Sequence, residues 1–158
     1  PTLRMASAGF FSAMKPGAVF VNSSRGKIVC DEALCEALDD GRVSRAVIDT
    51  WNGEPQIDRR LLALSTLATP HIAGYSIQGK AAGTAAVVRA VGRRYRLPLD
   101  DWYPAAVSPT RPVPIGWDEM GRTMPRYFDI VAESERLKSR PQDFESIRNR
   151  YDYRTEFF

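Results

Sequence analysis

The stretch AVFVNSSRGKIVCDEALCEALDDGRVSRAVIDTW, residues 18–51, decides the fold of this chain. Its two ends, AVFVNSS (18–24) and RAVIDTW (45–51), are short apolar runs rich in β-branched residues. Runs of this kind predict buried strands. The stretch therefore predicts one strand at each of its ends.

The residues between these two runs predict a helix. Asp31 stands where an N-cap is expected, and Gly41 where a helix of this length would end. The apolar residues that recur at helical spacing are Ala33, Leu34, Ala37 and Leu38. The stretch thus reads as strand, helix, strand.

The alternation continues on both sides of this stretch. Residues 10–14 offer an apolar helical face, residues 61–64 suggest one helical turn, and residues 65–70 a further short strand. A long alanine-rich helix is expected over residues 77–95. Helices that alternate with strands through short links are typical of an α/β protein with a parallel sheet.

The last third of the chain has a different character. Five of the eleven prolines fall between residues 98 and 114, which indicates a boundary or an extended arm. Residues 124–139 and 143–154 then predict two amphipathic helices. A tail of about 45 residues is too short for a core of its own. We expect it to pack on the α/β part or on another subunit.

Composition limits the kinds of partner that this chain is expected to have. Of its 158 residues 44% are hydrophobic, which suits one globular domain or part of a domain with an appendage. The net charge of +3 is small, and Arg89, Arg93, Arg94 and Arg96 fall at the end of a predicted helix, where cations complement the helix dipole. We expect no nucleic-acid partner. No apolar run reaches the roughly 20 residues of a membrane span, so we expect a cytoplasmic protein with no membrane partner.

A metal site is not expected either. Cys30 and Cys35 lack the spacing of a zinc site, and a single histidine excludes a site with several histidine ligands. Two thiols in a chain that is not secreted usually stay reduced.

Polar side chains of different kinds follow each of the three predicted strands. Arg25 follows the first, Asp49 and Glu54 the second, and His71 the third. Ligands gather at the carboxyl ends of parallel strands. Oxidation of a secondary alcohol beside a carboxylate needs a base, an acid that orients it, a planar cation and a hydride acceptor. His71 can be the base, Glu54 its partner, and Arg25 the cation that binds a carboxylate through two hydrogen bonds.

Each of these residues also has an ordinary structural interpretation. Arg25 could be a surface arginine, Asp49 a turn or cap residue, Glu54 a solvated acid, and His71 a packed histidine. Their common position after three successive strands favours the catalytic interpretation.

The blocks that carry these residues resemble one enzyme family. The stretch from Met14 to Pro55, followed by ATPHIAGYS (68–76), is similar to the second half of the nucleotide-binding domain of D-2-hydroxyacid dehydrogenases. The blocks NxSRG, DxWxGEP and TPHIAG occur in the order and spacing of that family. The resemblance implies half of a Rossmann-like parallel sheet, an NAD cofactor and oxidation of a 2-hydroxy acid.

The resemblance also implies a role for each site residue. Arg25 would bind the substrate carboxylate, Glu54 would partner the histidine, and His71 would be the general acid and base. Asp49 would face the nicotinamide end of NAD, and Gly74 would approach the cofactor through its backbone.

Two further segments resemble one branch of the family, which acts on a phosphorylated 2-hydroxy acid. The motif GYSxxGKxxGT, from Gly74 to Thr84, is similar to that branch, in which the tyrosine matching Tyr75 contacts the substrate. The tail over residues 126–154 resembles the added dimerisation domain of the same branch, so a homodimer is expected.

Three parts are therefore predicted. They are residues 1–96, the second half of an NAD-binding domain with the catalytic residues, residues 97–117, a proline-rich connection, and residues 118–158, a C-terminal dimerisation domain. The sequence contains no GxGxxG turn, so we expect the pyrophosphate-binding turn and a substrate domain to precede Pro1, and these residues alone to be inactive.

Two alternatives remain open at this point. One is a member of the same family that acts on another 2-hydroxy acid, such as glycerate or phosphoglycerate. The other is a dimerising, NAD-sensing module without turnover.

Overall fold

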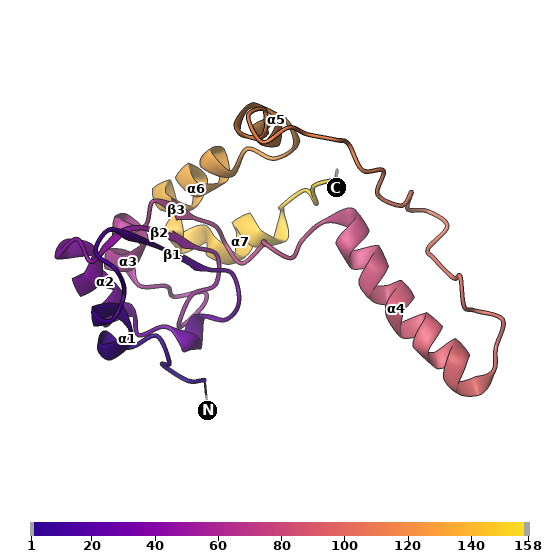
Figure 1. The fold of residues 1–158 in the computed structure, drawn as a ribbon, viewed down its shortest axis with the longest axis horizontal. Coiled ribbons are helices and arrows are strands. Elements are labelled where there is room, and N and C mark those ends of the chain that lie inside the picture. The colour runs from indigo at the N-terminus through magenta and orange to yellow at the C-terminus, as the bar shows by residue number, and fades with distance from the viewer. Residues whose placement is uncertain (1, 157–158) are drawn as a thin grey trace. The chain divides into compact units, whose positions relative to one another are not determined.

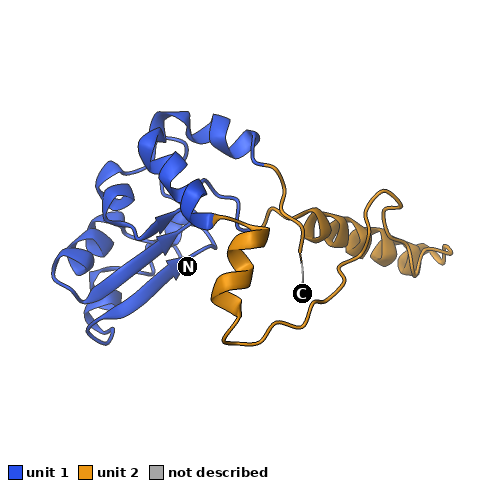
Figure 2. Cartoon of the chain, turned by 90° about the horizontal axis from the view of Figure 1, so that it is seen from above, with its two compact units in different colours: residues 1–73, 130–151 blue, residues 74–129, 152–158 orange. Residues whose placement is uncertain are grey.

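The computed structural model describes residues 2–156, which form two compact units. Among the described residues, the first unit combines residues 2–73 with residues 130–151, and the second combines residues 74–129 with residues 152–156 (Figure 2). The predicted boundaries at residues 96 and 117 stay a prediction for the complete protein.

The first unit is built on a three-stranded parallel sheet in the order β1-β2-β3 (Figure 1). Its strands are β1 (Ala18–Asn22), β2 (Val43–Ile48) and β3 (Leu67–Ala68). The register pairs Asn22 with Ile48, and Ile48 with Ala68. The carboxyl ends of all three strands are thus level with one another. The parallel sheet confirms the predicted α/β fold.

Helices precede and link these strands and supply much of the core. They are α1 (Ala8–Ser12), the 3₁₀ turn η1 (Gly26–Ile28), α2 (Asp31–Asp39) and α3 (Arg59–Leu64). In α2 the predicted apolar face is largely buried, with Leu34 at 0% exposure. Gly41 follows the helix with a φ of +77°, the left-handed conformation that favours glycine.

The N-terminal end of α2 differs from the prediction. Cys30, not Asp31, is the N-cap, and no side chain caps the helix. Asp31 is the first helical residue, so its carboxylate lies in the first turn instead of accepting a capping hydrogen bond. An acidic residue fits either position, because both place negative charge at the positive end of the helix dipole.

Two helices from the end of the chain complete the first unit, namely α6 (Ile130–Ser139) and α7 (Phe144–Asn149), with the short 3₁₀ turn η2 (Pro141–Asp143) between them. Leu137 and Phe144 are almost fully buried in the same core as the sheet residues. The Ser134 hydroxyl accepts a hydrogen bond of 3.0 Å from the backbone N–H of Ala68, so α6 satisfies an amide of the edge strand β3 (Figure 1). Of the two packing alternatives for the tail, its α6–α7 part therefore packs on the α/β part.

The second unit contains α4 (Ile77–Tyr95) and α5 (Met120–Tyr127). The predicted helix over residues 77–95 is confirmed, and Ser76 caps it by accepting a hydrogen bond of 3.0 Å from the N–H of Gly79. The predicted helix over residues 124–139 is instead two helices, because the chain is extended at Phe128. Of the helices in residues 2–156, none has both the length and the apolar character to cross a membrane.

The carboxyl group of Asp31 provides a test of this packing. Its pKa is raised to about 6, chiefly by burial and also by the nearby Asp58, while Arg4 opposes the shift. Because the folded-state pKa lies above the ordinary 3.8, the native state binds the proton more tightly, and stability is lost as the pH rises from about 4 to about 6.

We therefore expect Asp31→Asn to raise the free energy of unfolding at pH 7.5 by about 1 kcal/mol, a value reduced for partial solvent screening. Denaturant unfolding at pH 7.5 and pH 4 measures this, and the gain should vanish at pH 4. Glu32→Gln, an exposed change of equal charge in the same helical turn, is the control and should give no gain. A less stable Asp31→Asn protein at pH 7.5 would contradict the assignment.

Candidate active site

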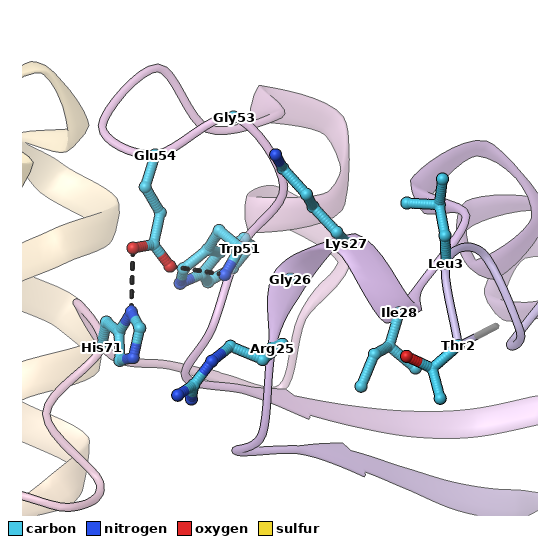
Figure 3. Close-up of a pocket in the computed structure, with 10 residues that line it drawn as sticks. All are labelled: Thr2, Leu3, Arg25, Gly26, Lys27, Ile28, Trp51, Gly53, Glu54 and His71. Atoms are coloured by element: carbon cyan, nitrogen blue, oxygen red, sulfur yellow. Dashed lines mark hydrogen bonds and ion pairs between the residues drawn. The ribbon is translucent and has the colours of Figure 1, made fainter.

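A pocket of about 680 Å³ opens within the first unit (Figure 3). Its lining brings together residues from the loops that follow β1 and β2, from the loop that follows β3, and from the N-terminal segment. The lining residues are Thr2, Leu3, Arg25, Gly26, Lys27, Ile28, Trp51, Gly53, Glu54 and His71. Three of the predicted site residues, Arg25, Glu54 and His71, thus share one pocket.

The loop that carries Arg25 is organised by Asn22, the last residue of β1. The buried side-chain amide of Asn22 donates hydrogen bonds of 3.2 Å to the carbonyls of Arg25 and Thr50, and its oxygen accepts one from the N–H of Ser24. One side chain therefore joins the loops after β1 and β2. The Arg25 side chain is exposed and extends toward the same side of the pocket as His71 (Figure 3).

Gly26 allows these two loops to approach each other. A Cβ atom at this position would overlap the carbonyl group of Trp51 and crowd the backbone nitrogen of Asn52. Both obstacles are backbone atoms, which cannot rotate away as a side chain could. The glycine after Arg25 is therefore required by the close contact between the loop that carries Arg25 and the loop that carries Glu54.

Glu54 and His71 form a direct pair. The Nδ1 atom of His71 lies 2.9 Å from Oε2 of Glu54, and the other carboxylate oxygen accepts a hydrogen bond of 2.8 Å from the N–H of Trp51. Figure 3 shows both interactions. With both oxygens engaged, the carboxylate has a fixed direction. An ionised Glu54 favours the tautomer with the proton on Nδ1, which leaves the Nε2 lone pair free to accept a proton.

The loop after β3 places His71 in a conformation that side-chain-bearing residues rarely adopt. His71 has a φ of +59°, in the left-handed region. Its N–H donates a hydrogen bond of 2.8 Å to the carbonyl oxygen of Asp49. The side chains of His71 and Glu54 are 27% and 20% exposed, so the pair is reachable from the pocket without being fully solvated.

Asp49 is buried behind this loop and is not a lining residue of the pocket. Its Oδ1 atom accepts hydrogen bonds from the hydroxyl of Thr69 at 2.7 Å and from the N–H of Ile72 at 2.8 Å, and Oδ2 accepts one from the N–H of Ala73 at 3.1 Å. The carboxylate thus binds the chain on both sides of His71. Its predicted role toward a cofactor stays a prediction.

Gly74 and Tyr75 belong to the second unit. The Tyr75 ring packs edge-on against Tyr153, with a centroid separation of 5.3 Å, and the Lys80 ammonium lies 4.0 Å from the Tyr75 ring centroid. A Cβ atom at Gly74 would have no heavy atom within 4 Å, so the backbone there is open to a ligand. The roles predicted for both residues stay predictions.

Sequence reasoning missed several residues that shape the site. Asn22 and Thr69 hold the loops through side-chain hydrogen bonds, and Lys27 adds a second cation to the pocket lining. The position of Asn22 and Thr69 at the carboxyl ends of predicted strands was a usable signal. The geometry of their hydrogen bonds could not be predicted from the sequence, because it depends on how the three loops meet.

Comparison with known proteins gives a consistent result. Residues 1–73 match the family described as "D-isomer specific 2-hydroxyacid dehydrogenase, NAD binding domain". The chain is 40% identical over 159 aligned positions to an erythronate-4-phosphate dehydrogenase of Bacteroides fragilis, covering 98% of this chain and 44% of that protein. An enzyme of the same name from Escherichia coli is 32% identical, covering 99% and 44%. The chain therefore spans less than half the length of these relatives.

A solved structure supports the same relationship. The D-isomer specific 2-hydroxyacid dehydrogenase of Xanthobacter autotrophicus, in complex with NADPH and MES, aligns with a TM-score of 0.50 at 28% identity. The alignment covers 61% of this chain and 40% of that one.

Gly26 gives a direct test of the loop contact that shapes the pocket. We expect Gly26→Ala to lower the free energy of unfolding by about 3 kcal/mol, because the new methyl group collides with the backbone of Trp51 and Asn52. Gly9→Ala is the matched control. Gly9 lies in α1 with no heavy atom within 4 Å of a Cβ position, so alanine there should stabilise the protein by about 0.5 kcal/mol. Equal effects of the two substitutions in denaturant unfolding would rule out the close contact.

Proposed function

We propose that the complete protein that contains this chain is a D-isomer specific 2-hydroxyacid dehydrogenase, the family whose NAD-binding domain residues 1–73 match. In this proposal it oxidises 4-phospho-D-erythronate to its 2-oxo acid with NAD, in the synthesis of pyridoxal 5′-phosphate. The observation that carries the proposal is the hydrogen bond between Glu54 and His71 in a pocket that Arg25 also lines. A base, its orienting acid and a planar cation are the groups that this reaction needs from a protein.

The residues of the pocket can perform the proton transfer as follows. Arg25 binds the substrate carboxylate through two parallel hydrogen bonds and so orients the neighbouring hydroxyl. Nε2 of His71 accepts the hydroxyl proton while Nδ1 keeps its own proton toward Glu54. The Glu54 carboxylate stabilises the imidazolium that results. In the reverse direction the same nitrogen returns the proton to the 2-oxo group.

The remaining requirement is a hydride acceptor, which NAD supplies when it is bound. Asp49 and Gly74 are the residues that would hold its nicotinamide end. They fit this role in chemistry, since a carboxylate oxygen such as Oδ2 of Asp49 can accept more than one hydrogen bond, and the backbone at Gly74 is open. The glycine-rich turn that would hold the pyrophosphate does not occur in these 158 residues.

The substrate assignment rests on residues other than those that carry out the proton transfer. The alignments with two relatives named for erythronate 4-phosphate span nearly the whole chain, and therefore also the segment that begins at Gly74 and the C-terminal tail. We propose that Tyr75 contacts the substrate and that the complete protein is a homodimer through its C-terminal domain. An enzyme for another 2-hydroxy acid would keep Arg25, Glu54 and His71 but would not need Tyr75.

The role of His71 is tested in the complete protein that contains this chain. We expect His71→Ala to lower kcat by about 10³-fold, because the substitution removes the imidazole that accepts the hydroxyl proton. NAD affinity, measured by calorimetry, should stay within about threefold, which shows that the fold is intact. Arg25→Lys is the companion variant, and its main effect should be a higher KM for the hydroxy acid. Full activity of His71→Ala would remove this residue from the mechanism.

Substrate choice is tested by comparing kcat/KM for a set of acids. We expect 4-phospho-D-erythronate to exceed D-glycerate and 3-phospho-D-glycerate by at least about tenfold. Unphosphorylated D-erythronate serves as the matched control for the phosphate group. A preference for glycerate or phosphoglycerate would overturn the substrate assignment but would still agree with a 2-hydroxyacid dehydrogenase. NAD binding without turnover of any of these acids would favour a sensing module.

A further inference from the structure

We propose that Asp49 is a positioning residue, whose carboxylate holds His71 in its left-handed conformation and so places Nε2 for proton transfer. The proposal deepens the proposed function and rests on it, because it concerns turnover through His71. It also differs from the role that the family resemblance implies, in which Asp49 faces the cofactor.

The hydrogen bonds of Asp49 enclose His71 along the chain. The hydroxyl of Thr69 donates to Oδ1 from the N-terminal side, while the N–H groups of Ile72 and Ala73 donate to the carboxylate from the C-terminal side. The backbone of Asp49 makes a fourth contact, since its carbonyl oxygen accepts the N–H of His71 at 2.8 Å. One residue therefore forms hydrogen bonds with the chain before His71, at His71 and after it.

The conformation of His71 explains why such a clamp is needed. A residue with a side chain at a φ of +59° is strained, and it persists only where its surroundings hold it there. Asp49 is 5% exposed, so its hydrogen bonds form away from competing water. The N–H groups of the turn point at a buried negative charge, which favours this backbone conformation over the alternatives in which they would point elsewhere.

Asp49 is itself held firmly. Its N–H donates a hydrogen bond of 2.9 Å to the carbonyl of Asn22, the residue at the end of β1 that also organises the Arg25 loop. Asn22 thus anchors both the turn that carries His71, through Asp49, and the loop that carries Arg25. A base and a cation that act on one small substrate need this common reference, because a shift of about 1 Å can cost 10²-fold in rate.

The test uses the complete protein and two readouts. In Asp49→Asn the amide oxygen can still accept from Thr69 and Ile72, but the new NH₂ group faces the N–H of Ala73, so the turn must shift. We expect kcat at saturating NAD to fall by about 10²-fold, beside any rise in KM for NAD that comes from losing the cofactor contact proposed above. A cofactor contact alone would give a raised KM for NAD with kcat retained, and that pattern would overturn the proposal.

Thr69 supplies a milder variant in case Asp49→Asn folds poorly. Thr69→Val removes the hydroxyl and keeps the shape, and should lower kcat by roughly tenfold, the lower end of the contribution of a hydrogen bond to a charged group. Thr69→Ser keeps the hydroxyl and should restore kcat. Ser65→Ala removes a buried hydrogen bond to Leu61 that lies outside the pocket lining, so it controls for a general loss of stability and should leave kcat unchanged. Equal kcat values for Thr69→Val and Thr69→Ser would count against the clamp.

Hydrogen exchange provides the readout that does not depend on activity. We expect the backbone amides of residues 71–73 to exchange at least about tenfold faster in Asp49→Asn, while those of β2 keep their wild-type rates. Unchanged exchange at residues 71–73 would overturn the clamp even in an active enzyme. If the wild-type protein oxidises no 2-hydroxy acid, the proposed function fails, and the exchange rates still decide whether Asp49 holds the turn.

Discussion

The carboxylate of Asp49, at the end of β2, accepts hydrogen bonds from the turn after β3, while its own N–H reaches the carbonyl of Asn22 at the end of β1. The carboxyl ends of three strands are joined in this way by one residue. The parallel register makes the arrangement possible, because it brings Asn22, Ile48 and Ala68 level with one another. The pocket lies where these strands end. The positions of the side chains that line it therefore depend on these hydrogen bonds.

Much of this architecture could be predicted from local patterns. β-Branched runs bounded by turns predict strands, and helical spacing between them predicts the crossover that makes the sheet parallel. Once the sheet is parallel, the residues that follow each strand must gather at one edge. Arg25, Glu54 and His71 could therefore be placed together without any knowledge of their contacts.

Other features depend on contacts between segments that are distant in sequence, and these could not be predicted. The left-handed φ of His71 follows from hydrogen bonds to Asp49, and the need for glycine at position 26 follows from the backbone of Trp51. The packing of α6 beside β3 depends on Ser134, whose hydroxyl accepts a hydrogen bond from the backbone N–H of Ala68 in the edge strand. The expected N-cap at Asp31 failed for a related reason. A cap is defined by backbone conformation, and an acidic residue one position later satisfies the helix dipole equally well.

The two carboxylates of the segment DTWNGEP, Asp49 and Glu54, show how the environment gives chemically similar groups different roles. Asp49 is buried and accepts hydrogen bonds from neutral N–H and O–H donors, so its hydrogen bonds shape the backbone. Glu54 is partly exposed and divides its oxygens between one backbone N–H and the imidazole of His71. The charge that develops on His71 during proton transfer therefore faces Glu54, while Asp49 acts on the same residue through its backbone. A substitution at Glu54 should change how well the base works, and one at Asp49 should change where the base lies.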